Sequence, residues 1–144
     1  MPQVSRSALV PFSARQMFEL VNDVPSYPQF LPGCTGARVL DSTLNSMTAS
    51  VDVSKAGISK TFTTANELVD SQRIDMRLVD GPFKKLVGGW HFIELDSDAC
   101  KVELQLDFEF TNALVEMAFG KVFKELTGNM VSAFTQRAKE VYDC

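Results

Sequence analysis

The chain has 144 residues, enough for one domain spanning 1–144 with a substantial core. Apolar residues make up 45% and charged residues 22%, which excludes disordered and fibrous proteins. The net charge of −4 disfavours general nucleic-acid binding, so DNA is not an expected partner, and RNA contact would require a local basic patch.

The cysteines and the N-terminus predict a cytoplasmic protein. Cys34, Cys100 and Cys144 are an odd number without CxxC spacing, and the chain opens without the apolar core of a secretory signal. This usage is typical of a reducing compartment, and Cys34 is expected to be a small buried hydrophobe. No window approaches 18 consecutive apolar residues, so no transmembrane segment is expected.

The first third of the chain predicts a strand, a helix and an arm. Residues 4–10 form the strand. A helix then starts at Ser13, because Ser13 and Gln16 have the spacing of a capping box. Pro25 and Pro28 restrict residues 24–31 to a helical turn or an irregular arm.

From residue 34 to residue 110 the apolar period is two, which predicts strands. Short turns separate the alternating runs, so the strands are expected to form an antiparallel meander of six. Residues 102–110 alternate most regularly, with apolar side chains on one face and charged side chains on the other.

The last 30 or so residues predict one amphipathic helix. Asn112 is a good N-cap, and apolar residues recur at intervals of three, four or seven up to Val141. A helix of this length spans about 45 Å and must cross the whole sheet. Gly120 and Gly128 within it indicate a close backbone approach, a kink or room for a ligand, with plain tolerance as the alternative.

This α+β order resembles the START-like helix-grip architecture, a curved antiparallel sheet of about seven strands around a long C-terminal helix, with one or two short helices after the first strand. Residues 21–34 (VNDVPSYPQFLPGC) resemble the opening signature of the bacterial ribosome association toxin A family, relatives of the mitochondrial coenzyme Q-binding proteins. Residues 80–86 (DGPFKKL) and 89–92 (GWHF) are similar to its second block. The helix ending, with Ala133, Phe134 and Tyr142, is similar too.

The resemblance implies two functions of different classes. Kinship with the coenzyme Q-binding proteins implies a non-enzymatic protein that holds ubiquinone or a similar polyprenyl lipid between sheet and helix, linked to respiratory quinone function and requiring no cofactor. The closer bacterial match implies a toxin that binds the large (50S) ribosomal subunit and blocks subunit association. The residues themselves do not decide between them.

Eleven phenylalanines and six methionines supply a deformable lining for a flexible apolar ligand, although packed core is the alternative for every one of these positions. The arm is expected to cover the cavity mouth or to pack on the sheet edge. The candidate ligand-contacting residues are Tyr27, Phe30, Leu31, Phe62, Met76, Phe83, Trp90, Phe92, Leu104, Leu106, Phe108, Phe119, Val122, Leu126 and Met130.

Basic residues offer a candidate ribosome contact. Lys84 and Lys85 are adjacent in the chain and could form a phosphate-contacting edge with other cations, although a solvated face explains them equally well. Those other cations are Lys55, Lys60, Arg73, Arg77 and Lys101.

Enzyme chemistry has little support in the sequence. His91 is the only histidine, which excludes a multi-histidine metal site, and its phase places it on the outer face. No nucleophile or phosphate-loop motif is present. START-like relatives include polyketide cyclases, for which Asp23, Glu67 or Glu94 would have to serve as an acid or base, but solvated carboxylates are the expected alternative.

Overall fold

The computed structural model describes residues 3–55 and 57–142, without the side chain of Lys55. Seven strands and three helical segments follow the predicted order. They are β1 (Gln3–Val10), α1 (Ala14–Asn22), the 3-10 helix η1 (Val24–Gln29), β2 (Cys34–Ser42), β3 (Ser46–Lys55), β4 (Ile58–Val69), β5 (Arg73–Asp80), β6 (Phe83–Asp96), β7 (Ala99–Phe110) and α2 (Ala113–Tyr142).

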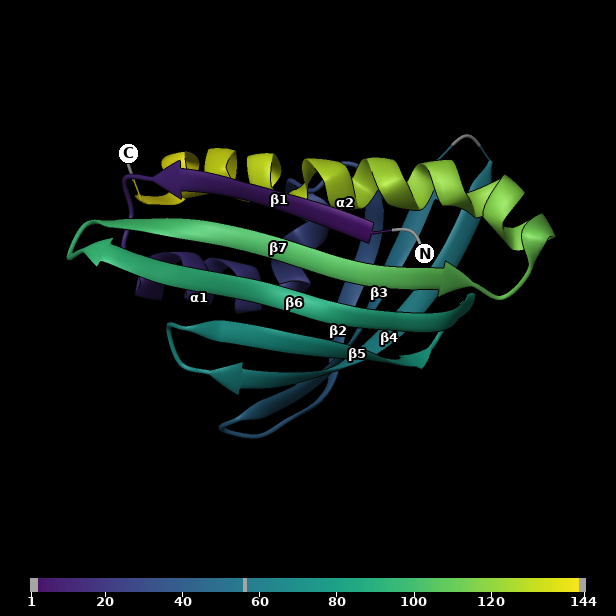
Figure 1. Cartoon of the computed structure of the whole chain (residues 1–144), viewed down its shortest axis with the longest axis horizontal. Coiled ribbons are helices and arrows are strands. Elements are labelled where there is room, and N and C mark those ends of the chain that lie inside the picture. Colours follow the sequence, from purple (N-terminus) through teal and green to yellow (C-terminus); the bar gives the residue numbers. More distant parts are fainter. Residues whose placement is uncertain (1–2, 56, 143–144) are drawn as a thin grey trace.

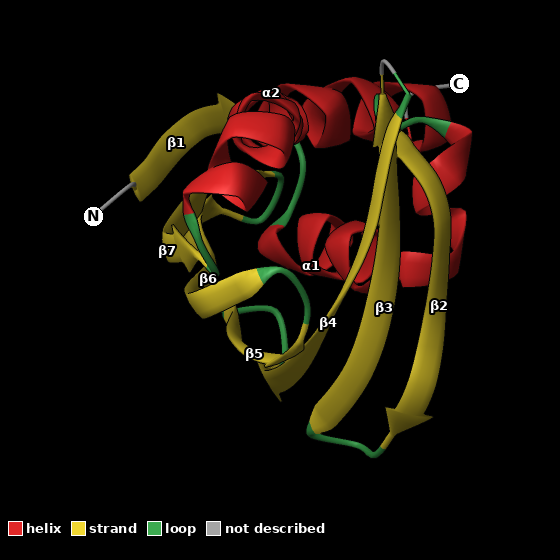
Figure 2. Ribbon diagram, turned by 90° about the vertical axis from the view of Figure 1, so that its right-hand side faces the viewer, coloured by secondary structure: helices red, strands yellow, loops and turns green. Residues whose placement is uncertain are grey.

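The strands form one antiparallel sheet in the order β1-β7-β6-β5-β4-β3-β2. The sheet curves so strongly that its two ends lie on opposite sides of α2, and β1 runs beside this helix (Figures 1 and 2). The predicted helix-grip fold is therefore confirmed: a curved sheet encloses one long helix.

The caps predicted from the sequence are present at both helices. Ser13 Oγ accepts a hydrogen bond from the Gln16 backbone N–H at 3.1 Å, and Gln16 Oε1 accepts one from the Ser13 N–H at 3.0 Å. Asn112 Oδ1 accepts from the Val115 N–H at 2.9 Å and so caps α2. The arm with two prolines folds as η1, a helical turn.

The core lies between the concave face of the sheet and α2. Every second residue of β7 from Val102 to Phe110 is at most 5% exposed, as the alternation predicted. Near the start of α2, Phe119 and Phe123 pack against Phe83, Phe108 and Phe110, with ring centroids 4.9–6.3 Å apart. This end of the interior is thus filled by aromatic side chains.

Gly88 allows β6 to pass close to β7. Its φ of +151° is one that side chains rarely adopt, and a Cβ there would lie 2.0 Å from the carbonyl oxygen of Gln105. Gly120 and Gly128 on α2 have no such constraint, because a Cβ at either would meet its nearest neighbour at 3.5 Å or more. The structure therefore favours plain tolerance of the two helical glycines.

These glycines generate a paired prediction. Gly88→Ala should lower the free energy of unfolding by about 1–3 kcal/mol, because the new Cβ strains the backbone and overlaps β7. Gly128→Ala should raise it by about 0.5–1 kcal/mol, because alanine reduces the freedom of the unfolded chain. Urea unfolding measures both, and equal effects of the two changes would contradict this assignment.

Candidate functional site

A small cavity of about 60 Å³ lies between the sheet and the middle of α2. Side chains from η1, from strands β3 to β7 and from α2 surround it. Its lining residues are Val24, Tyr27, Leu31, Ala49, Val51, Phe62, Thr64, Asn66, Met76, Leu86, Trp90, Leu106, Phe123, Leu126, Thr127 and Met130.

The structure brings about half of the predicted ligand-contacting residues to this cavity. Those that line it are Tyr27, Leu31, Phe62, Met76, Trp90, Leu106, Leu126 and Met130. Those outside its lining are Phe30, Phe83, Phe92, Leu104, Phe108, Phe119 and Val122. Phe83, Phe108 and Phe119 belong to the aromatic cluster near the start of α2, where packing leaves no space for a ligand.

Sequence reasoning missed three polar lining residues. Thr64, Asn66 and Thr127 are each more than nine-tenths buried. Thr64 and Asn66 lie on the same face of β4 as Phe62, so the period of two already places them toward the interior. They were not predicted as ligand contacts because only apolar residues of that face were considered. The other missed lining residues are Val24, Ala49, Val51, Leu86 and Phe123.

The polar lining residues are held by short-range hydrogen bonds. Thr64 Oγ1 donates to Asn66 Oδ1 at 2.8 Å, and Thr127 Oγ1 donates to the Phe123 carbonyl at 3.0 Å. These contacts satisfy the hydroxyl donors and fix the orientation of the Asn66 amide. The cavity is thus a mostly apolar space with polar side chains on β4 and on α2.

Side chains of η1 and of the residue that follows it contact α2. Tyr27 and Phe30 lie edge-on to Phe134, with ring centroids 5.3 and 5.1 Å apart. The Arg137 guanidinium lies 5.2 Å from the Phe30 ring centroid and donates to Gln29 Oε1 at 2.9 Å. The Tyr27 hydroxyl donates a hydrogen bond to the Val21 carbonyl. Burial raises the pKa of Tyr27 far above its usual value.

Three residues border both the cavity and a depression on the surface. Leu126 lines a depression of about 210 Å³, Met76 one of about 400 Å³ and Leu106 one of about 270 Å³. The cavity of about 60 Å³ is less than half the size of one that binds benzene, about 150 Å³. A ring-sized ligand therefore requires side chains of the lining to move.

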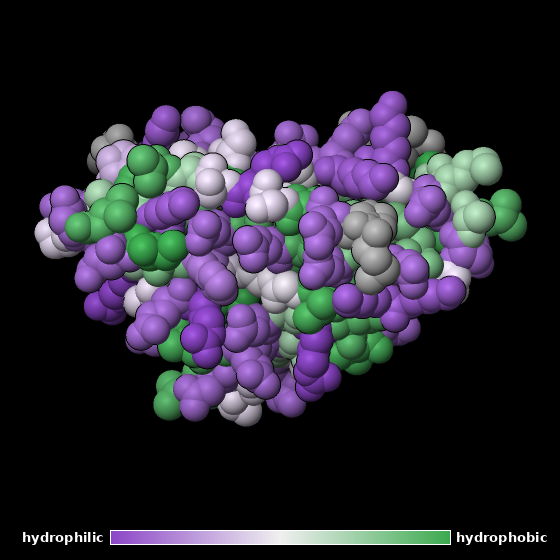
Figure 3. All heavy atoms as spheres, in the orientation of Figure 1, coloured by the Kyte–Doolittle hydropathy of each residue, from purple (hydrophilic) through white to green (hydrophobic). Residues whose placement is uncertain are grey.

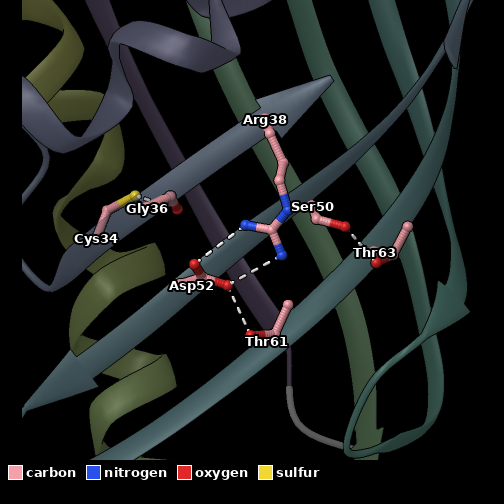
Figure 4. A network of polar contacts seen from close by, with 7 residues as sticks. All are labelled: Cys34, Gly36, Arg38, Ser50, Asp52, Thr61 and Thr63. Carbon is pink, nitrogen blue, oxygen red and sulfur yellow. Dashed lines mark hydrogen bonds and ion pairs between the residues drawn. The ribbon is translucent and has the colours of Figure 1, made fainter. Parts of the chain in front are cut away.

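The convex face of the sheet carries a polar network over β2, β3 and β4 (Figure 4). Asp52 accepts hydrogen bonds from Thr61 at 2.6 Å and from Arg38 at 3.1 Å, which lower its pKa. Beside them, the hydroxyls of Ser50 and Thr63 lie 2.6 Å apart. This network explains why both hydroxyl residues are buried on the face away from the cavity.

A β-bulge exposes Lys84 and Lys85 together. The pairing of β6 with β7 shifts between Phe83 and Lys85, so Phe83 and Leu86 are both buried while the two lysines between them face solvent. No ion pair joins either lysine to an acidic side chain among the residues that the structure describes. Hydrophilic side chains cover most of the face seen in Figure 3.

The other predicted cations do not all gather at this edge. Arg73 pairs with Asp75 at 3.0 Å, and Lys101 pairs with Glu103 at 3.5 Å. Both pairs lie toward the opposite end of β6, since Arg73 is opposite His91 and Lys101 is opposite Ile93. Of the two alternatives, a solvated charged face therefore describes these two residues, and the Lys55 side chain lies outside the described part.

The carboxylates considered for catalysis lie away from the cavity. Asp23, Glu67 and Glu94 are all exposed, as is His91, and none of the four lines the cavity. Within residues 3–55 and 57–142, no group of three His, Cys, Asp or Glu side chains is placed to hold a metal ion. In the same ranges, no helix is long and apolar enough to cross a bilayer.

Two cysteines are buried thiols, and Cys144 lies outside the described residues. Burial raises the pKa of Cys100 to about 11 and also raises that of Cys34. Because the thiolate is the reactive form, both thiols are expected to react slowly at pH 8.

We predict that Ellman's reagent modifies Cys34 and Cys100 only after urea unfolding, as peptide mapping would show. Rapid labelling of either in the native protein would contradict this assignment.

The fold and its cavity define a START-like helix-grip domain. Residues 10–135 match the family model described as polyketide cyclase / dehydrase and lipid transport. Within this broader group, the chain belongs to the ribosome association toxin RatA family, as its sequence identity to members of that family shows.

The relatives support this assignment over nearly the whole chain. The chain is 71% identical over 142 residues to "Ribosome association toxin RatA" of Escherichia coli K12, covering 99% of this chain and 90% of that protein. It is 72% identical, with the same coverage, to "Persistence and stress-resistance toxin PasT" of E. coli O6:H1. A "Coenzyme Q-binding protein COQ10 homolog B" of Xenopus laevis is 26% identical and 59% covered.

Solved structures show the same fold. An aromatase/cyclase from a Streptomyces species superposes with a TM-score of 0.84 at 19% identity, covering 96% of this chain and 94% of the other. An 18 kDa protein of Caulobacter crescentus has a TM-score of 0.76 at 30% identity, with both chains covered completely. The likeness to the cyclase supports the fold and not its chemistry.

Proposed function

We propose that the protein binds the large ribosomal subunit in the cytoplasm and blocks its association with the small subunit. The observation that carries this proposal is the 71% identity, over 99% of the chain, to a relative named as a ribosome association toxin. Identity at this level extends over surface residues as well as the core, so the binding surface of the relative is expected here too.

Lys84 and Lys85 are the proposed contact. The bulge presents two adjacent ammonium groups, and neither forms an ion pair among the described side chains, although Glu109 lies opposite Lys85 in the sheet. Free ammonium groups suit phosphates of ribosomal RNA. The protein as a whole is acidic, so a local contact of this kind is required for binding to RNA.

Replacing both lysines tests the contact. We expect Lys84→Glu with Lys85→Glu to weaken cosedimentation with large subunits, because two phosphate contacts become repulsive. Each lost contact should also reduce the slope of log affinity against log salt by about 0.7–0.9.

The matched control is Arg15→Glu with Lys139→Glu, which changes the net charge equally. Both residues are exposed on helices at the other end of the molecule (Figure 1). Undiminished affinity and an unchanged salt slope in the Lys84/Lys85 variant would show that another surface binds the ribosome.

A second function is favoured by the cavity. We propose that the same protein binds an apolar ligand of the polyprenyl quinone type between the sheet and α2, without catalysing its conversion. A mostly apolar space with a few polar side chains supports binding, and no carboxylate, histidine or cysteine lines it among the described residues. Likeness to a coenzyme Q-binding protein supports the quinone class.

Trp90 provides a direct test, because it is the only tryptophan, is 1% exposed and lines the cavity. Titration with decylubiquinone should quench its emission with saturation. Leu126→Phe should weaken this binding, since the larger side chain obstructs the boundary with the surface, whereas Leu114→Phe on the exposed start of α2 should not. An unquenched wild-type protein would contradict ligand binding.

A further inference from the structure

Asn66 is a buried side chain whose hydrogen-bonding capacity is only partly used. The residue is 8% exposed, and its Oδ1 accepts a hydrogen bond from the Thr64 hydroxyl at 2.8 Å. Among residues 3–55 and 57–142, no protein group is found to accept a hydrogen bond from its Nδ2, and no side-chain nitrogen or oxygen that is sealed from water lacks a partner, so Nδ2 is open to water. Because Asn66 lines the cavity, this donor faces the space where a ligand would lie.

A purely hydrocarbon ligand in the cavity would exclude water from this donor and leave it unpaired, which is unfavourable. A ligand with an acceptor oxygen beside Asn66 would accept a hydrogen bond from it instead. The surroundings also suit a flat head group, since the rings of Phe62 and Trp90 line the same cavity.

We propose that Asn66 donates a hydrogen bond from Nδ2 to a carbonyl oxygen on the ligand's ring. The ring then lies beside Asn66 in the cavity. Thr64 is a positioning residue, because its hydroxyl holds the amide oxygen and leaves the amide nitrogen free to donate. This inference rests on the proposed ligand binding and adds the residue that recognises the head group and the acceptor oxygen that the head group must carry.

The test compares two ligands that differ in their oxygen atoms. Decylubiquinone carries ring carbonyls, whereas decylbenzene has an equally long chain and a ring without oxygen. Calorimetric titration should show that wild-type protein binds decylubiquinone more tightly. Asn66→Leu should reduce that preference about tenfold, the factor expected for one buried hydrogen bond, while decylbenzene binding persists.

The matched control is Ser50→Val. Ser50 is also buried and polar, but its hydroxyl pairs with Thr63 on the convex face, so its loss should leave the ligand preference unchanged. Persisting decylbenzene binding shows that the cavity of the Asn66 variant is intact. If Asn66→Leu binds neither ligand, Thr64→Val provides the second test. Without the Thr64 hydroxyl the Asn66 amide is no longer held, so the preference for decylubiquinone over decylbenzene should also fall.

The outcomes separate the two proposals. If wild-type protein binds neither ligand, the ligand-binding proposal fails and the inference about Asn66 fails with it. If wild-type protein and Asn66→Leu prefer decylubiquinone equally, ligand binding stands but the placement of the ring beside Asn66 is overturned. Ribosome binding is measured separately and is unaffected by either result.

Discussion

The closure of a strongly curved sheet around one 30-residue helix is the constraint on which the rest of the structure depends. Burial of the apolar faces of β7 and α2 against each other drives this closure. Near the start of α2 the space is filled by phenylalanines, including Phe119 and Phe123. Toward its middle, Leu126 and Met130 leave a small cavity. Helix grip and candidate site are therefore two parts of one packing arrangement.

The two proposed functions use different faces of this arrangement. The cavity lies on the concave side of the sheet, whereas the bulge turns Lys84 and Lys85 toward solvent. The bulge also buries Phe83, which packs in the aromatic cluster against Phe123 at a centroid distance of 4.9 Å. The position of the candidate ribosome contact thus depends on the same core, even though the lysines take no part in the cavity.

The sequence predicted the architecture because helix caps and periodicity are local signals. Ser13, Asn112 and the alternation of residues 102–110 each specify an element without reference to distant residues. The site was harder to predict, since period two places Phe62 and Phe108 on the same face but does not show where packing is complete. Asn66 illustrates a second limit of prediction from sequence. The period of two predicts the face of β4 on which it lies, but its burial depends on α2 and on strands far away in sequence.

The central claim is association with the large ribosomal subunit, and subunit joining tests it most directly. Purified large and small subunits can be mixed with and without the protein and separated on a sucrose gradient. We expect the protein to migrate with large subunits and the fraction of joined ribosomes to decrease as its concentration rises. Normal joining, with the protein remaining at the top of the gradient, would contradict association with the large subunit.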